Sequence, residues 1–162
     1  MRKQNNRVFL GGTCNESTWR EKLIPKLKID YFNPVVADWN EEAQRREEQE
    51  KKDCTFSLTV FTENTYTMEA LCFIAAVVDA SNKDPYRTIF CVLNEAFYWS
   101  DKERFFLGMI SNLVENNGAK VCKSLEEVAE YLNNQTFEEG EEVKKVRKEA
   151  MLEKARSGCF VW

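Results

Sequence analysis

The chain of 162 residues contains no histidine. Histidine is the side chain that enzymes use most often for acid and base catalysis near neutral pH. Its absence leaves carboxylates to carry any acid, base or nucleophilic chemistry in this protein. The search for a catalytic site therefore starts from aspartate and glutamate.

The sequence also lacks a recognisable metal site. Its six cysteines form no pair at the spacing of a metal or redox motif, so the sequence implies no metal and no cofactor. Cys54, Cys72 and Cys91 fall inside apolar runs, which predicts buried free thiols. Free thiols are typical of a reducing compartment, and we expect the cytoplasm.

Long hydrophobic runs and a surplus of positive charge are both missing. No stretch approaches the roughly 20 apolar residues of a membrane span, and the N-terminus has no signal-peptide core. The net charge is −4, and lysine and arginine are interleaved with glutamate, whereas phosphate backbones attract clustered basic residues. The sequence therefore favours a protein that binds neither membranes nor nucleic acids.

Five segments have the composition of β-strands, and helical patterns alternate with them. Three are rich in β-branched and aromatic residues (7–11, 54–61 and 88–93), and two are weaker (29–32 and 119–122). Strict alternation predicts an α/β fold with a parallel sheet and helices on both faces. We expect a three-layer flavodoxin-like (Rossmann-like) domain with a five-stranded parallel sheet.

The helical segments differ in how much core they should cover. Residues 41–52 are almost wholly polar or charged, which predicts an exposed helix. Residues 66–80 are apolar nearly all round, which predicts a helix packed on several sides. Ser17 and Thr18 can cap the first helix, and Pro25 should bend or end it.

The composition changes after Asn134. We expect residues 1–134 to form the α/β domain and residues 135–162 to form a C-terminal helical extension with an apolar tail. Residues 137–156 hold six acidic and six basic side chains beside a narrow apolar stripe. This pattern fits either a solvated terminal helix or a helix that docks on a neighbouring subunit of a homo-oligomer.

Two loops at strand ends are candidates for ligand binding. Gly11, Gly12 and Thr13 follow the first strand, where glycines allow close approach of backbone and a helix start favours anionic groups. The loop lacks the Gly-x-Gly-x-x-Gly dinucleotide fingerprint, so it predicts a pocket floor without identifying the ligand. Cys14 and Arg20 have the spacing of a cysteine phosphatase loop, but neighbouring acidic and bulky residues would disfavour a phosphate there.

The second loop offers groups that suit a nucleobase. Asn33 either ends the strand by turn chemistry or presents an amide to a ligand. Asp38 adds a carboxylate, and Trp39 adds an aromatic face on which a base can stack. Asn33, Asp38 and Trp39 are therefore candidate binding residues.

Glutamates gather around the third strand. Glu69 follows that strand at the start of a helical pattern, where it either caps backbone amides or faces a ligand. Glu63 and Asn64 lie in the strand-to-helix loop, and Glu47 lies on the preceding helix. Paired carboxylates around one sugar are the usual means of breaking a glycosidic bond.

Taken together, four stretches resemble the nucleoside 2-deoxyribosyltransferase-like family. They are Val8-Phe-Leu-Gly-Gly-Thr-Cys-Asn-Glu-Ser-Thr-Trp-Arg20, Tyr31-Phe-Asn-Pro-Val-Val-Ala-Asp-Trp39, the acidic helix with Gln44 and Glu47, and Tyr66-Thr-Met-Glu69. The resemblance covers roughly residues 7–93. Their combination is specific to the family, whereas each stretch alone is not.

The resemblance implies a glutamate that attacks the anomeric carbon of a nucleoside, and Glu69 matches it by position. Glu63, or Asn64, stands where the family has a second acidic residue, and Glu47 is similar to an acidic residue on the second helix. Phe9 replaces an aromatic residue that is often tyrosine, which removes a hydroxyl near the nucleophile. Met68, next to Glu69, joins the expected binding residues.

The resemblance thus implies transfer of a deoxyribosyl group from one base to another through a covalent glutamyl intermediate. An alternative is hydrolysis of nucleoside 5′-monophosphates or related nucleotides, which is favoured if the glycine loop binds phosphate. A further alternative is a nucleotide-binding sensor without turnover. The expected partners are a small nucleoside or nucleotide and further copies of the same chain.

Overall fold

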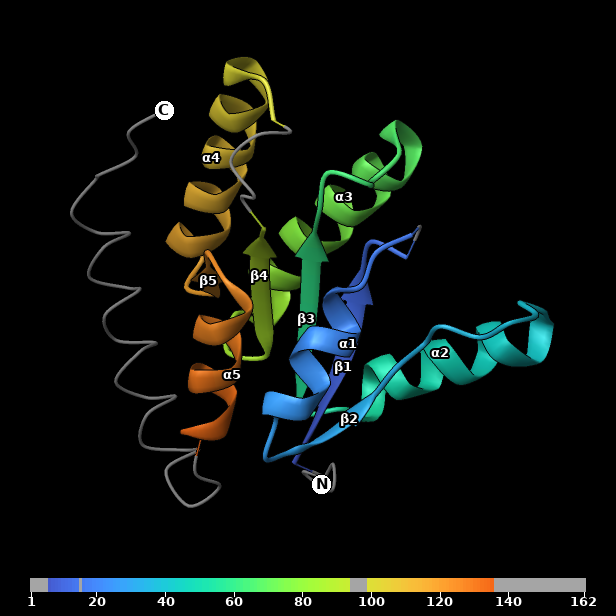
Figure 1. Ribbon diagram of the computed structural model, residues 1–162. Helices are drawn as coiled ribbons and strands as arrows, with labels where there is room; N and C mark the ends of the chain where they lie inside the picture. Colours follow the sequence, from blue (N-terminus) through green and yellow to red (C-terminus); the bar gives the residue numbers. More distant parts are fainter. Residues whose placement is uncertain (1–5, 15, 94–98, 136–162) are drawn as a thin grey trace.

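A computed structural model describes residues 6–14, 16–93 and 99–135 of the chain (Figure 1). The strands are β1 (Arg7–Gly12), β2 (Asp30–Phe32), β3 (Phe56–Phe61), β4 (Thr88–Val92) and β5 (Lys120–Cys122). The helices are α1 (Trp19–Leu23), the 3-10 turn η1 (Ile24–Lys26), α2 (Glu41–Asp53), α3 (Thr67–Lys83), α4 (Asp101–Asn116) and α5 (Leu125–Asn133).

The five strands form one parallel sheet in the order β2-β1-β3-β4-β5. This order is the one that flavodoxin-like proteins share, and ligands of such sheets bind where β1 and β3 diverge at their carboxyl ends. The predicted three-layer α/β fold with five parallel strands is confirmed. Strand alternation in the sequence was sufficient to predict it because each strand is short and separated from the next by a helix.

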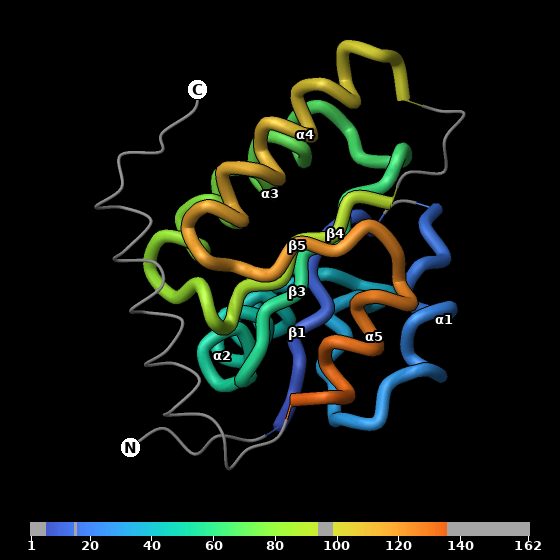
Figure 2. The backbone as a smooth tube through the Cα atoms, turned by 90° about the vertical axis from the view of Figure 1, so that its left-hand side faces the viewer, coloured from blue at the N-terminus to red at the C-terminus, as the bar shows by residue number. Residues whose placement is uncertain are grey.

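Helices cover both faces of the sheet (Figures 1 and 2). We name the side with α1 and α5 the closed face, because it carries a continuous buried core. Its members are Val8, Leu10, Trp19, Leu23, Phe56, Leu58, Val60, Ile89, Cys91, Cys122, Leu125, Val128, Ala129 and Leu132. We name the side with α2, α3 and α4 the open face. Its core is smaller and comprises Phe61, Val77, Phe90, Leu107, Val114 and Ala119.

Side-chain caps explain where several helices begin. The Asn40 side chain accepts from the backbone amides of Glu42 and Ala43, and the Ser100 hydroxyl accepts from the Glu103 amide. Pro25 ends the first helix early, as predicted, because α1 stops at Leu23 and passes into a 3-10 turn. Thr18 occupies the position before α1 but makes no capping hydrogen bond through its side chain, so the predicted cap is wrong.

The prediction for α2 is confirmed and the prediction for α3 is wrong. No residue of α2 is buried, in agreement with its charged sequence. In α3 only Val77 and Ser81 are buried, and Leu71 is 58% exposed. A helix with apolar residues on all sides is therefore not packed on several sides in this protein. Helix α3 contacts the sheet and α4, and its outer side is exposed.

The cysteine prediction holds for two residues of three. All five cysteines of the described part are free; Cys54 and Cys91 are buried, whereas Cys72 lies exposed on α3. The error at Cys72 has the same cause as the error for α3. The expected helical extension lies outside the described residues, since they end at Gln135. None of the helices in the described ranges has the length and apolar character that a membrane crossing requires.

Candidate active site

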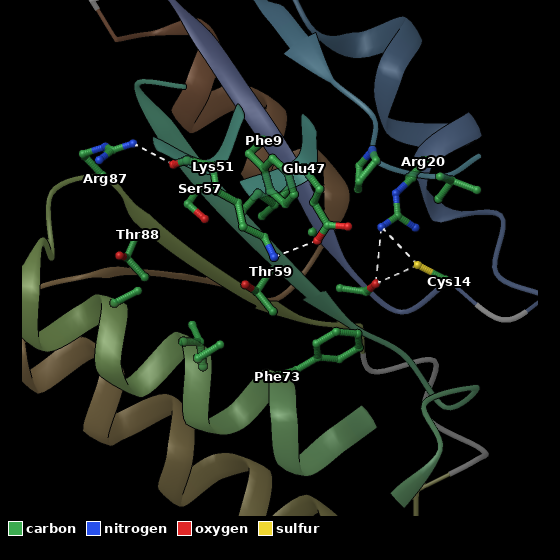
Figure 3. A pocket seen from close by; sticks show the side chains of 18 of the residues that line it. Phe9, Cys14, Arg20, Glu47, Lys51, Ser57, Thr59, Phe73, Arg87 and Thr88 are labelled. Carbon is green, nitrogen blue, oxygen red and sulfur yellow. Dashed lines mark hydrogen bonds and ion pairs between the residues drawn. The ribbon is translucent and has the colours of Figure 1, made fainter. Parts of the chain in front are cut away.

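A groove of about 540 Å³ crosses the open face between α2 and α3 (Figure 3). Its floor is formed by β1 and β3, and its walls by the loop after β2, by α2 and by α3. At one end lie Cys14 and Arg20, at the carboxyl edge of the sheet, and at the other end lie Arg87 and Thr88. The groove thus begins where this fold usually binds ligands and continues along the sheet toward the opposite edge.

The glycine loop is required by close packing at the carboxyl end of β1. Gly12 has φ of +113°, and a Cβ atom there would lie 2.0 Å from the carbonyl oxygen of Val60. A Cβ atom at Gly11 would lie 3.0 Å from the Leu58 oxygen and 3.1 Å from the Phe9 ring. The two glycines allow β1 to approach β3 closely, and both also line the groove. The predicted pocket floor therefore contains glycines that strand packing requires.

Thr13 acts as a structural tie between the two loops rather than as a groove residue. Its hydroxyl donates to the Val60 carbonyl at 3.3 Å and accepts from the Thr62 amide at 3.0 Å. It also shares a hydrogen bond with the Thr65 hydroxyl. Thr13 is fully buried and does not line the groove. These bonds hold the loop after β1 against the loop that precedes α3.

Arg20 is the residue whose role the sequence interpretation missed. Its guanidinium is buried beneath the glycine loop and donates to the carbonyl oxygens of Leu10 and Thr13 at 2.8 to 3.2 Å. It also stacks on the Trp19 ring, with the guanidinium carbon 4.1 Å from the ring centroid. The spacing of six residues between Cys14 and Arg20 was the sequence signal that could have indicated this role.

Arg20 shapes the loop without being a phosphate clamp. Burial lowers the pKa of the Arg20 guanidinium, while the Cys14 thiol and the Glu47 carboxylate oppose that shift. An arginine side chain stays protonated even so, and it brings positive charge to the edge of the groove. Because several of its N–H donors are engaged by loop carbonyls, it does not have the arrangement that a cysteine phosphatase needs.

Glu47 and Phe9 lie together in the middle of the groove. Glu47 is half-buried and pairs with Lys51 at 2.7 Å, one turn further along α2 (Figure 3). Lys51 Nζ lies 5.2 Å from the centroid of the Phe9 ring, which also stacks on Phe32 at 5.8 Å. A carboxylate paired with an ammonium group therefore lines the groove at this level, beside the buried ring of Phe9.

Glu69 lies in the first turn of α3, and its Oε2 accepts a hydrogen bond from the Tyr66 amide at 3.3 Å. In this conformation it caps the helix. Helical spacing nevertheless places Glu69 on the same side of α3 as Phe73, Ala76 and Ala80, which line the groove. Glu69 is therefore positioned one turn beyond the groove lining, at the carboxyl edge of the sheet.

Glu63 and Asn64 lie apart from the groove. Both line a separate hollow of about 390 Å³ between the starts of α1 and α5, with Lys22 and Lys123 among its other residues. The structure therefore brings Glu47 into the groove and Glu69 to its end, while Glu63 faces the neighbouring hollow.

Four candidate binding residues remain, and they occupy different positions relative to the groove. The Asn33 side chain accepts from the Val35 amide at 3.2 Å, which is the turn role considered for it. Trp39 is 60% exposed and lines the groove. Asp38 is exposed and Met68 is 72% exposed, and neither lines the groove. Of this set, Trp39 alone contributes to the groove wall.

No metal-binding cluster is present among residues 6–14, 16–93 and 99–135, where no three histidine, cysteine, aspartate or glutamate side chains gather. The groove lining contains two carboxylates, Glu47 and Asp84, and each has a cationic neighbour within 4 Å. The groove lining also includes the cationic side chains of Arg20, Lys51 and Arg87 and the Cys14 thiol.

Comparison with protein families matched residues 5–113 to the family described as nucleoside 2-deoxyribosyltransferase like. The matched part runs from the segment before β1 into α4 and includes the whole groove lining. Comparisons with curated proteins and with solved structures returned no match. The family match covers more than half of the chain and agrees with the flavodoxin-like strand order and the groove beside β1 and β3. The chain therefore belongs to the nucleoside 2-deoxyribosyltransferase-like family.

Proposed function

We propose that the protein cleaves the N-glycosidic bond of (deoxy)nucleosides and transfers the deoxyribosyl group to another base. The proposal is supported chiefly by the position of Glu69. It lies at the carboxyl edge of the sheet and on the groove side of α3, in a chain of the family described above. A change of side-chain rotamer would move its carboxylate from the Tyr66 amide toward the groove.

In the first step the Glu69 carboxylate attacks the sugar C1′ atom as the bond from C1′ to the base nitrogen breaks. The base leaves with the bonding electrons and takes up a proton from an acidic neighbour or from water. The sugar is then held as an ester of Glu69. In the second step a nitrogen of another base attacks C1′ and releases the carboxylate, whereas attack by water would give hydrolysis.

Other groove residues have roles that follow from their positions. Glu47 is the carboxylate of the groove centre, where it can hold a sugar hydroxyl or exchange a proton with the leaving base. Trp39 is 60% exposed and offers an aromatic surface for a sugar or base, whereas the buried ring of Phe9 forms part of the groove floor. Glu63 lines a separate hollow, so it would take part only if the loop before α3 changed conformation and brought its side chain toward Glu69.

The test is base exchange by the full chain, followed by chromatography with and without an acceptor base. We expect a new nucleoside that depends on the acceptor, and a loss on the order of 10³-fold or more in kcat for Glu69→Gln. Glu48→Gln is the matched control, because Glu48 is exposed on α2 and does not line the groove. Full activity of Glu69→Gln would exclude this mechanism, and free base without an acceptor would identify a hydrolase of nucleosides or of their monophosphates.

A second candidate is a nucleotide-binding sensor without turnover. The observation that favours it is the engagement of Glu69 in the cap of α3, together with the separation of Glu63 from the groove. A sensor would show a ligand-dependent rise in melting temperature and no product from any nucleoside or monophosphate. Product formation would exclude it.

We also propose that the protein is a homo-oligomer in a reducing compartment, the cytoplasm. A run of large apolar side chains is exposed on α3 and α4; it comprises Met68, Leu71, Phe105, Phe106, Met109 and Leu113. Monomeric proteins rarely leave such surfaces uncovered, so a second copy of the chain is a suitable partner. The five cysteines within the described residues are all free, which supports a reducing environment.

A further inference from the structure

We propose that Arg87 is a positioning residue for Glu47, because it holds the carboxyl-terminal end of α2 against the sheet. Glu47 lies on α2 and lines the groove, whereas Arg87 directly precedes β4. The inference rests on the proposed function for what Glu47 does to a ligand. It adds the residue that determines where the Glu47 carboxylate lies.

Helix α2 forms one wall of the groove, yet it buries no residue, so it lacks the apolar contacts that hold most helices in place. Near its amino-terminal end the contacts are local: the Asn40 side chain accepts from the first amides, and Arg45 pairs with Glu41 at 3.8 Å. In Figure 1 this end projects away from the sheet. Further along, the Arg46 guanidinium carbon lies 5.4 Å from the centroid of the Phe32 ring, which is a weak contact at an exposed site. The position of α2 therefore depends on the contacts of its last turns.

Arg87 ties the end of α2 to the sheet through a fork of hydrogen bonds. Its Nη2 donates to the carbonyl oxygens of Lys51, at 3.3 Å, and of Cys54. Its Nε donates to the Thr55 carbonyl at 2.9 Å. The last carbonyls of a helix have no partner within the helix, and a cation near them also interacts favourably with the helix dipole. Arg87 is therefore suited to fix both the position and the direction of this helix end.

The main chain of Arg87 is itself held by the sheet, so the fork starts from a rigid point. The Ser57 amide donates to the Arg87 carbonyl at 2.7 Å, and the Arg87 amide donates to the Asp84 carbonyl at 3.2 Å. The Asp84 carboxylate also lies 3.7 Å from the guanidinium. The next residue, Thr88, is in register with Ser57 between β3 and β4. A displacement of α2 would therefore break the fork rather than move Arg87 with it.

Glu47 lies one helical turn from a carbonyl that Arg87 binds. Lys51 provides this carbonyl, and its ammonium group pairs with the Glu47 carboxylate at 2.7 Å (Figure 3). The two residues are about 6 Å apart along the helix axis, so a contact that holds Lys51 holds Glu47 as well. Arg7 of β1 pairs with Glu50 at 2.9 Å and ties the same end of α2. Two arginines at the sheet thus determine where the Glu47 carboxylate lies in the groove.

A direct contact of Arg87 with a ligand is the alternative, because Arg87 also lines the inner end of the groove. Two substitutions separate these roles. Lysine keeps the positive charge but lacks the planar fork that binds several carbonyls. Glutamine loses the charge, and its amide nitrogen lies where arginine has Nε. It therefore keeps the bond to Thr55 and loses the bonds to Lys51 and Cys54.

The test is base exchange by Arg87→Lys and Arg87→Gln in the full chain. We expect both to lower kcat/KM by about tenfold or more, since a small displacement of an acting group has effects of this size. The change should appear in the same parameter, kcat or KM, that Glu47→Gln changes. Arg45→Lys is the matched control, because Arg45 is exposed on α2 and pairs with Glu41. It should leave kcat/KM within about twofold.

A double-mutant cycle tests whether Arg87 acts through Glu47. In a Glu47→Gln background, Arg87→Gln should change kcat/KM by less than about twofold. Loss of folded protein, or a separate contact with the ligand, would give additive effects instead and would overturn the inference. Full activity of Arg87→Lys together with a loss in Arg87→Gln would also overturn it, because the charge would then act on the ligand.

Hydrogen exchange gives a readout that needs no activity. In Arg87→Gln the amides of residues 51–53 should exchange at least about tenfold faster, while those of β3 and β4 stay unchanged. Unchanged exchange of residues 51–53 would overturn the inference. If neither Arg87 variant folds, Glu50→Gln releases the same helix end from Arg7 and takes their place in both experiments, with the same criteria.

Two outcomes separate this inference from the proposed function. If the unaltered protein shows no base exchange, the cycle is measured as affinity for 2′-deoxyadenosine by calorimetry. A loss of affinity that depends on Glu47, without turnover, would refute the proposed function and support the inference. Base exchange that both Arg87 variants retain in full would refute the inference and leave the proposed function intact. Absence of both turnover and binding would overturn both.

Discussion

The two faces of the sheet are built from the same strands but are covered to different extents. On the closed face, α1 and α5 bury a continuous core against β1, β3 and β4. On the open face, α2 buries no residue, α3 buries two, and a groove separates these two helices. The first face accounts for most of the packed core, and the second carries the candidate site and the exposed apolar surface.

This difference shows how one chain can combine a rigid sheet with an accessible site. Leu58 and Val60 point to the closed face and are fully buried, while the neighbouring Ser57 and Thr59 point to the open face and are half-buried hydroxyls. Strand periodicity of two residues separates the two roles within one strand. Substitutions on β3 should therefore affect stability or ligand binding according to the face.

The largest loss of stability is expected where the two faces meet, at Gly12. A methyl group in Gly12→Ala would lie 2.0 Å from the Val60 oxygen and 2.5 Å from the Val60 nitrogen, and the positive φ would be strained. We expect a loss of more than about 4 kcal/mol in the free energy of unfolding, measured with urea. Gly108→Ala is the control, because that position on α4 has open space, and it should be neutral or stabilising by up to about 1 kcal/mol. Equal effects of both substitutions would contradict the packing argument.

The next effect compares the two faces directly. Leu58→Ala removes a fully buried side chain from the closed face and should cost about 2–5 kcal/mol. Phe73→Ala removes a larger but half-buried side chain from the groove wall, and we expect it to cost less than Leu58→Ala in the same urea titration. A greater cost at Phe73 would mean that the groove is filled by protein in solution.

A substitution on the outer side of α4 should change the stability of the monomer little and should change its assembly strongly. Phe106 is 54% exposed, and Phe106→Glu places a charge within the apolar surface of α3 and α4. We expect the free energy of unfolding of the monomer to change by less than about 0.5 kcal/mol. Sedimentation should show a shift from oligomer to monomer. Lys102→Glu, an exposed charge change on the same helix, should leave the assembly intact, and an unchanged oligomer in Phe106→Glu would exclude this surface as the interface.

The sequence was sufficient for the fold and for part of the candidate site. Five strands were predicted because each is a short apolar run between turn residues, and the glycine loop followed from its position after the first strand. The exposure of α3 was missed because an apolar composition does not reveal whether a helix is covered by the same chain. The uncovered side of Leu71 and Cys72 is therefore a property of the tertiary arrangement.

The candidate carboxylates show a second limit. Sequence spacing brought Glu47, Glu63 and Glu69 to one region, but side-chain direction decides which cavity each one reaches. The conformation of the loop after β3 determines the hydrogen bond of Glu69 to the helix cap and the hollow that Glu63 lines. Thr13, in the loop after β1, holds this loop in place by a hydrogen bond. Such a tie between segments 49 residues apart has no local sequence signal.

Modification of the exposed cysteines should have the smallest effect on stability. The reaction rates of exposed and buried cysteines test whether the closed face is less accessible than the open face. Burial raises the pKa of Cys122, on the closed face, to about 11 and raises the pKa of Cys91 as well. A raised pKa keeps these thiols protonated at pH 8, so their thiolate fraction and alkylation rate should be low and should increase as the pH approaches 11. Cys14 and Cys72 are exposed, and among the five cysteines of the described residues iodoacetamide should label these two first in the native protein, with little change in the free energy of unfolding. Peptide mass spectrometry over time would measure the order. Labelling of Cys91 as fast as Cys72 would mean that the closed face opens on the same timescale as the exposed helix, and the distinction between the two faces would then fail.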